Sequence, residues 1–458
     1  MWLTGAAVYV DAFPRTEGET DDSPRITRAI ASAVTLGVRA VAFWGREYTL
    51  ASTVTIASDY LSLVGLGRAT ILQTAADVPL LSITGNYVTI RDMTIKTTTT
   101  ARTTFSVVCT DVYQPHLRDL YFSGVADARR SGVHLSGGSM GIIDRCTFSH
   151  SCIRVETWDV KIDKCYIWAM TCDYGIGVFS GTGNLTVSNT DVVPPLTSNV
   201  NGIAGIYVDA AGASMSLKFL GVYLDGNPDL VTGIGMKVSN TAGSVLISGV
   251  NANKMDSDCI VIDSAYGVTV ADYIGIGNNA SGLGSREIVV TQTGGQPTEA
   301  IQLKNISCVQ TTAVPASPVG AAPAIYIDSS VTSPGKVTIT DFSIKQPSGG
   351  GGYTLPEVSV PCVANTPLQH VTISGRGQLS LYSLSGSVEV DSGASGVTIS
   401  LTDPYPIAYR PDPSKIKLAT TGAILPPHRI QFITDSSIYV AFASAISGSA
   451  TLYWSVTL

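Results

Sequence analysis

The chain has 458 residues, of which 45% are hydrophobic and only 14% are charged. Soluble domains usually carry about 25% charged residues, so uncharged polar groups dominate this surface. The apolar content excludes a disordered chain, and no apolar run reaches the roughly 18 residues that a membrane span needs. A formal net charge of −7 without a basic block disfavours nucleic acid as a partner and favours a neutral or polar ligand.

The first predicted element is a helix over residues 23–37, the one convincing helical pattern in the chain. Ser23 can cap its start, Pro24 lies in its first turn and Gly37 can end it. Its apolar residues share one face, so we expect it to cover the open end of the stacked repeats that follow. Residues 1–4 lack the basic and apolar regions of a signal peptide, and we predict none.

After the helix, one strand phrase recurs along the chain. It is written YVTIRDMTI at 87–95, VKIDKCYI at 160–167 and VTITDFSI at 337–344. Equivalent residues run from Leu63 to Ile373 in eleven steps, a mean spacing of about 28 residues. β-Branched residues at period 2 predict strands, and each repeat is too small to bury its own apolar face. The pattern therefore predicts an all-β chain: a right-handed, single-stranded parallel β-helix over residues 51–402.

A second strand precedes each phrase, with inward pairs such as Ile153 with Val155 and Ile206 with Val208. The residues between and after these pairs then point outward in two columns. The first column is Ser82, Val108, His134, Arg154, Gly177, Tyr207, Lys237, Val261, Val289 and Tyr326, and the second is Thr84, Thr110, Ser136, Glu156, Phe179, Asp209, Ser239, Asp263, Thr291 and Asp328.

Two further patterns are structural. Asp or Asn recurs at the turn after the aligned strand, where such side chains hydrogen-bond the local backbone; the positions are Asp92, Asp119, Asn189, Asp272, Asn305 and Asp341. The eight cysteines form no CxxC pair, and their strand-like neighbours predict buried thiols rather than a metal site or disulfides. We predict neither a metal nor a cofactor.

The two ends of the chain differ from its middle. The proline-rich stretch at 403–413 should break the stack, and residues 414–458 alternate as short separate strands. We therefore expect an N-terminal segment with the capping helix over 1–50 and a small C-terminal β domain over 403–458.

Four stretches near the start of the chain form a recognisable signature: VYVDAF (8–13), TDDSPRITRAIASAV (20–34), VAFWGREYTL (41–50) and YLSLVGLG (60–67). They resemble the N-terminal signature of the pectate-lyase-like β-helix family found in bacteriophage tailspikes and capsule depolymerases. Two phrases depart from the family pattern, at Asp11-Ala12-Phe13 and at Trp44-Gly45-Arg46-Glu47-Tyr48.

This resemblance implies a homotrimer in the phage tail that acts at the outside of the host cell. It also implies that the C-terminal β domain trimerises the chain or binds carbohydrate. Contact with other tail proteins would run through an N-terminal attachment region that this sequence lacks. The family includes hydrolases, lyases, esterases and inactive members, so it does not fix the chemistry.

Residues 116–173 concentrate the groups that a sugar-binding groove needs. They hold 14 charged residues in 58, against 49 in the other 400. Glu156 and Asp209 lie two coils apart in the second column, about 9.6 Å at about 4.8 Å per coil, near the upper limit for an inverting hydrolase. Phe179 between them could raise a carboxyl pKa, as a general acid requires. Asp173, in the loop before the next strand, is the reserve catalytic carboxyl.

We expect the glycan to be held by residues in and beside these columns: Arg154, His134, Trp158, Trp168, Tyr207 and Lys237, with Phe179 and Asp263. The predicted function is binding and hydrolysis of a bacterial capsular or surface polysaccharide, by a carboxyl pair. A lyase is the first alternative, in which a cation neutralises a uronate and a His, Tyr or Lys takes the proton. A non-catalytic receptor-binding fibre, with ordinary solvent-facing carboxylates, is the second.

Overall fold

The structure is a computed structural model, and its N-terminal two thirds are described almost continuously. The described residues are 7–100, 102–125, 130–199, 202–210, 216–226, 232–241, 243–278, 285–294, 296–309, 324–328, 330–331, 337–345, 358–359, 371–374, 383–391, 394–400, 416–422, 428–434, 437–444, 447 and 450–457. Asp127, Arg129, Cys362 and the proline-rich stretch 403–413 lie outside them.

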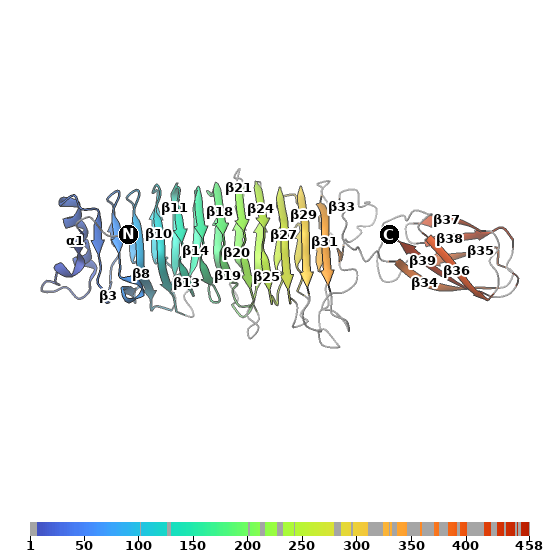
Figure 1. The fold of residues 1–458 in the computed structure, drawn as a ribbon, viewed down its shortest axis with the longest axis horizontal. Helices are drawn as coiled ribbons and strands as arrows, with labels where there is room; N and C mark the ends of the chain where they lie inside the picture. Colours follow the sequence, from blue (N-terminus) through green and yellow to red (C-terminus); the bar gives the residue numbers. More distant parts are fainter. Residues whose placement is uncertain are drawn as a thin grey trace.

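Helix α1 (Ser23–Thr35) lies at the N-terminal end of a long stack of coils (Figure 1). It packs against β1 (Val8–Tyr9) and the short helix η1 (Val10–Ala12), and it ends two residues before Gly37. Its cap differs from the prediction. Asp22 precedes the helix, while the Ser23 hydroxyl donates to the carbonyl of Ser52 and so ties the helix to the coil beneath it.

The stack is a parallel β-helix built from two sheets. Sheet one has twelve strands: β4 (Val54–Ile56), β7 (Leu81–Ile83), β9 (Val107–Thr110), β11 (Gly132–Ser139), β14 (Cys152–Trp158), β17 (Tyr174–Phe179), β20 (Ala204–Asp209), β23 (Ile234–Ser239), β26 (Ile260–Asp263), β28 (Ile288–Thr291), β30 (Ile325–Ile327) and β32 (Val358–Ser359). The strands of this sheet pair in parallel, each with its counterpart one coil away.

The second sheet has twenty-one strands, since most coils contribute two of them on either side of a bend. Its strands are β1, β2 (Ala40–Ala42), β3 (Glu47–Thr49), β5 (Ser62–Val64), β6 (Ile71–Thr74), β8 (Thr89–Thr97), β10 (His116–Ser123), β12 (Ile142–Asp144), β13 (Thr147–Ser149), β15 (Val160–Asp163), β16 (Tyr166–Trp168), β18 (Asn184–Ser188), β19 (Asp191–Val193), β21 (Ser216–Leu220), β22 (Tyr223–Asp225), β24 (Ser244–Ser248), β25 (Asn251–Asn253), β27 (Val268–Ile276), β29 (Ile301–Val309), β31 (Val337–Lys345) and β33 (Val371–Ser374). A short helix, η2 (Gly67–Ala69), lies between β5 and β6.

The bend in the second sheet is the predicted Asp/Asn turn. All six predicted positions have positive φ between 48° and 59°: Asp92, Asp119, Asn189, Asp272, Asn305 and Asp341. Asn and Asp tolerate this left-handed conformation better than other residues with a Cβ. Arg145 and Lys164 adopt it as well, and Gly221 and Gly249 take the same position in two further coils.

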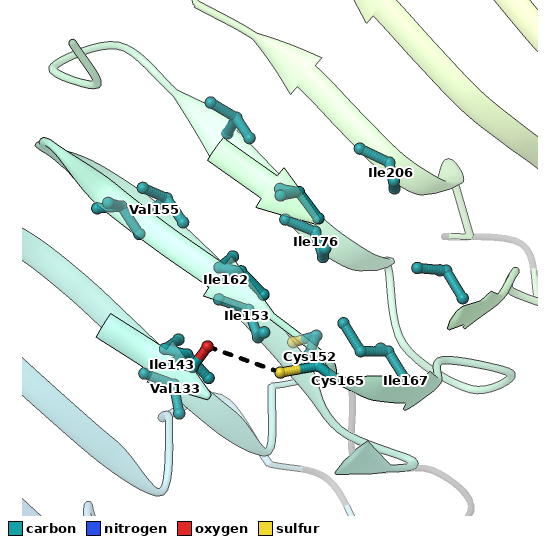
Figure 2. Close-up of a cluster of buried hydrophobic side chains, with 14 of the residues drawn as sticks. Val133, Ile143, Cys152, Ile153, Val155, Ile162, Cys165, Ile167, Ile176 and Ile206 are labelled. Carbon is teal, nitrogen blue, oxygen red and sulfur yellow. Dashed lines mark hydrogen bonds between the residues drawn. The ribbon is translucent and has the colours of Figure 1, made fainter. Parts of the chain in front are cut away.

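The interior of the stack is apolar, and its register is the predicted one. Ile153 and Val155 on β14 are fully buried, as are Ile162 and Ile167 on the following strands (Figure 2). The seven described cysteines are all buried, as predicted for them. Cys165 Sγ lies 3.8 Å from the carbonyl oxygen of Ile143, one coil away (Figure 2).

The C-terminal strands form two small antiparallel sheets. One has the order β34 (Ser383–Val390), β39 (Ala450–Thr457), β36 (Ile416–Gly422), and the other β35 (Gly396–Ser400), β38 (Ser437–Phe442), β37 (His428–Thr434). This change from parallel to antiparallel pairing agrees with the expected β-structured C-terminus. Within the described residues, the chain has no helix that is long and apolar enough to span a membrane.

Candidate functional site

The predicted outward columns exist as side-chain files on the twelve-stranded sheet. His134 pairs with Arg154, Arg154 with Gly177, Gly177 with Tyr207 and Tyr207 with Lys237. We call the central part of these columns the polar file; its members are His134, Arg154, Glu156, Phe179, Tyr207, Asp209, Lys237 and Asp263. The parallel register carries these positions from coil to coil, and the shift in β11 comes only after Ser136, so residues far apart in sequence share one face.

Both carboxylate oxygens of Glu156 contact other members of the polar file. Its Oε2 lies 2.7 Å from His134 Nε2, and its Oε1 accepts a 2.6 Å hydrogen bond from Arg154. Burial raises the pKa of Glu156, but the hydrogen bonds and charges of Arg154 and His134 outweigh it and hold the pKa below its ordinary value. The expectation that Phe179 raises the pKa of this carboxyl is wrong, because the Arg154 guanidinium lies 4.2 Å from the ring centroid, beside both groups.

The environment of His134 favours a neutral imidazole. Burial lowers its pKa below the ordinary value, and the hydrogen bond to Glu156 opposes this shift without reversing it. Because an ionised Glu156 only accepts hydrogen bonds, Nε2 carries the proton and donates it. The lone pair of His134 is then on Nδ1.

Asp209 accepts hydrogen bonds from a residue of its own coil and from a residue of the next coil. Its Oδ2 accepts a 2.9 Å hydrogen bond from the Tyr207 hydroxyl, and its Oδ1 accepts one of 3.0 Å from Asn240 Nδ2. The Phe179 ring meets the Tyr207 ring edge-on at 5.9 Å. Both carboxyl oxygens of Asp209 are therefore already occupied by hydrogen-bond donors.

Other predicted site residues lie in three different environments. Asp263 is buried and accepts hydrogen bonds from the Thr293 amide and hydroxyl, so it anchors a neighbouring loop and does not present a free carboxylate to a ligand. Lys237 Nζ is 3.9 Å from Asp263. Trp158 ends β14 and is 51% exposed, while Asp173 immediately precedes β17.

Trp168 does not lie on the polar file. It belongs to β16 in the twenty-one-stranded sheet, because the chain turns between β16 and β17. Its ring is stacked on His150 with centroids 6.1 Å apart. The sequence prediction placed it by proximity along the chain, whereas the strand on which it lies faces another side of the coil.

A second group of outward residues, which we call the β19 face, surrounds Trp168. It comprises Tyr166 and Trp168 on β16, Asp191 on β19, and Tyr223 and Asp225 on β22. Asp191 pairs with Tyr166 on one side and with Tyr223 on the other. The three aromatic side chains are 38%, 37% and 54% exposed in chain order. Exposed aromatic faces stacked beside carboxyl groups are typical of carbohydrate sites.

Asp191 is the unusual member of the β19 face. Its Oδ1 is buried and has no hydrogen-bond partner among the described residues. Burial, followed by the charge of Asp225, raises the pKa of Asp191 to about 6. Asp225 accepts a 3.2 Å hydrogen bond from Asn253 Nδ2. A carboxyl group kept protonated near neutral pH is what a general acid requires.

The sequence reasoning missed Asp191 and Asp225, although a signal was present. Tyr166, Asp191 and Tyr223 each lie two residues after the left-handed turn of their coil. They therefore occupy equivalent outward positions in three successive coils. Among the described residues, no group of three or more His, Cys, Asp or Glu could hold a metal ion.

No family model and no curated protein sequence matches the chain. Among solved structures it is similar to the Dettilon tailspike protein, with 13% identity and a TM-score of 0.54 over 99% of this chain and 94% of that one. It is also similar to the catalytic unit of a GH87 alpha-1,3-glucanase from Streptomyces thermodiastaticus, with 13% identity and a TM-score of 0.55 over 81% and 68%.

A third similar structure is the enzymatically active domain of bacteriophage CBA120 tailspike protein 2, with 12% identity and a TM-score of 0.51 over 99% of this chain and 70% of that one. At such identities the likeness establishes the fold. The chain therefore has the parallel β-helix fold that these two tailspike proteins share with the GH87 glucanase.

Proposed function

We propose that this chain is a phage tailspike depolymerase that binds and hydrolyses a bacterial capsular or surface polysaccharide. One observation carries the proposal: cations, carboxylates and aromatic rings form a continuous file on the outside of successive coils. With about 4.8 Å per coil, such a file spans several sugar units. The fold is one in which both phage tailspikes and a glucanase are found.

On the polar file, the carboxyl pair proposed for hydrolysis is Glu156 with Asp209, and Asp173 is the reserve. Their backbones lie two coils apart, at the upper limit of the ~6.5–9.5 Å range of an inverting pair. Glu156, whose pKa is lowered, suits the base that activates water. Asp209 would have to supply the proton, and Tyr207 would then turn its hydroxyl to accept a hydrogen bond.

The test measures release of reducing ends from a panel of purified bacterial capsular polysaccharides and O-antigens. We expect Glu156→Gln and Asp209→Asn each to lower kcat/KM at least ~10-fold, because each carboxylate holds two neighbouring polar side chains. A fall in kcat assigns the chemistry to the file, and a rise in KM alone assigns binding. Glu17→Gln, an exposed carboxylate elsewhere, is the matched control. Absence of any release by the unmodified chain would contradict the proposal.

A lyase is the second candidate, and the His134–Glu156 contact supports it. A neutral His134 with a free Nδ1 lone pair could take the proton next to a uronate carboxylate, and Arg154 could neutralise that carboxylate. A lyase leaves an unsaturated uronate that absorbs in the ultraviolet, whereas a hydrolase does not. Binding without any product would instead identify a receptor-binding fibre.

We also propose that the chain works as a homotrimer in the phage tail, at the outside of the host cell, as the tailspike resemblance implies. The C-terminal antiparallel sheets are the proposed trimerising or carbohydrate-binding part. Light scattering of the full chain tests the assembly: a mass three times that of one chain is expected, and a monomer at micromolar concentration would contradict it.

A further inference from the structure

We propose that the β19 face is where the glycosidic bond is broken, with Asp191 as general acid and Asp225 as general base. The inference rests on the proposed polysaccharide hydrolysis but assigns the proton transfers to residues other than Glu156 and Asp209. A polysaccharide is longer than either face. The polar file can therefore hold one part of the glycan while another part lies on the β19 face, which begins at Tyr166, eight residues before the first residue of β17.

The register of three strands brings the pair together. β16, β19 and β22 lie in successive coils, and Asp191 is directly between Tyr166 and Tyr223. Asp225 lies two residues beyond Tyr223, on the coil next to that of Asp191. With ~4.8 Å between coils and ~3.3 Å per residue along a strand, the two Cα atoms are about 8 Å apart. Carboxyl groups about 6.5–9.5 Å apart leave room for the water of an inverting hydrolase.

The neighbouring rings provide the surface for a sugar. Tyr166, Trp168 and Tyr223 are all more than a third exposed, and they lie on both sides of Asp191 along the stack. An aromatic ring offers an apolar face to the C–H face of a pyranose. A glycan lying across these rings would pass directly over the two carboxyl groups.

The two carboxyl groups lie in different environments, as an acid and a base must. Asp191 Oδ1 is buried without a hydrogen-bond donor among the described residues, which disfavours the charged form. Asp225, in contrast, accepts a hydrogen bond from Asn253 Nδ2. Besides Asp225, the titratable groups on the strands paired with β19 are Tyr166 and Tyr223.

The reaction follows from these states. Asp191 gives its proton to the glycosidic oxygen as the bond from that oxygen to the anomeric carbon breaks. Asp225 takes a proton from a water molecule whose oxygen bonds to the same carbon from the opposite side. The products are one chain with a new hydroxyl and one with a new hemiacetal. Asp191 is left ionised and Asp225 protonated, and exchange with solvent restores both.

The decisive experiment has two parts on the full chain. First, carboxyl carbon NMR follows the titration of Asp191 in the unmodified chain and in Asp225→Asn. We expect Asp191 to titrate near pH 6 and to move to lower pH in the variant, because the second cause of its raised pKa is removed. Titration at the ordinary aspartate value of about 4 would overturn the inference, whatever the glycan is.

Second, reducing-end release from the same polysaccharide panel is measured for Asp191→Asn and Asp225→Asn. We expect kcat to fall at least ~100-fold in each, with KM nearly unchanged and with folding confirmed by circular dichroism. Glu156→Gln should mainly raise KM, and Asp59→Asn, an exposed aspartate elsewhere, should change neither. Undiminished kcat in both Asp191 and Asp225 variants would overturn the pair. If the unmodified chain releases no reducing ends from any polysaccharide, the proposed function is contradicted. The titration of Asp191 then still tests its protonation state independently of activity.

Discussion

His134 Nε2 and Glu156 Oε2 lie 2.7 Å apart although 22 residues separate them in the sequence. The contact exists because β11 and β14 are neighbouring rungs, on which Ser136 pairs with Glu156 and His134 with Arg154. With the hydrogen bond from Arg154 it lowers the pKa of Glu156, whereas burial lowers the pKa of His134 in spite of the contact. Glu156 is ionised, His134 is neutral, and the pH dependence of stability should report this.

Glu156→Gln should destabilise the fold at pH 7, and the deficit should shrink in acid. The folded pKa of Glu156 is lowered, so its stabilising contribution is complete above the unfolded value of about 4.3 and is lost as pH falls through the folded pKa. Thermal unfolding between pH 7 and pH 3 measures this, with Glu17→Gln as the control. A deficit that stays constant with pH would contradict the assigned charge state.

Asp191→Asn should have the opposite effect and stabilise the fold above pH 6. The folded pKa of Asp191 is raised to about 6, so between about pH 4 and pH 6 the folded chain binds more protons than the unfolded one and stability falls as pH rises. The amide removes that loss. The melting temperatures of the two proteins should converge towards pH 4 and separate towards pH 7, and equal pH profiles would refute the burial of this carboxyl. Activity lost together with stability gained is a typical sign of a functional residue.

Gly183→Ala should disturb Trp158. A Cβ atom at Gly183 would lie 1.9 Å from Trp158 Cε3, closer than any tolerated contact, so the indole ring has to move. We expect a change in tryptophan emission and a loss of stability of about 1–3 kcal/mol, as for other overpacked sites. The double variant Gly183→Ala/Trp158→Ala should recover part of the cost of the glycine substitution, and strict additivity would argue against this contact.

Lys164→Asn should stabilise the chain. Lys164 has φ of 53° at the turn where Asn189, one coil further, has φ of 48°. A lysine in this left-handed region costs about 1–2 kcal/mol, and asparagine tolerates it better. A gain of about 0.5–1 kcal/mol is expected in urea unfolding, and Asn189→Lys should show a loss. A neutral result in both would mean that this turn is not strained.

Much of the fold could be predicted because a stack of short coils repeats its own pattern. Ile153 and Val155 alternate with Arg154 and Glu156, so one strand already reveals which side is buried. The Asp/Asn turn could also be predicted, because its left-handed backbone conformation favours Asp and Asn. Parallel pairing then propagates each column, and both predicted columns follow the observed register.

The candidate site was only partly predictable, because the functional properties depend on neighbours that the columns do not specify. Placing Glu156 and Asp209 on one file was possible, but the Arg154 contact that lowers the pKa of Glu156 depends on side-chain direction. Trp168 was predicted to hold the glycan because it lies in the stretch 116–173, but nearness in sequence does not say on which side of the bend a strand lies.

The sequence by itself determined the period of the coils, the side of each strand that is buried and the residues at the turns, because these depend on alternation and on local backbone preferences. The tertiary structure alone decided which carboxyl groups are ionised and which one, Asp191, stays protonated near pH 6. Burial and the distance to a second charge set a pKa, and both arise only when residues from different coils are brought side by side.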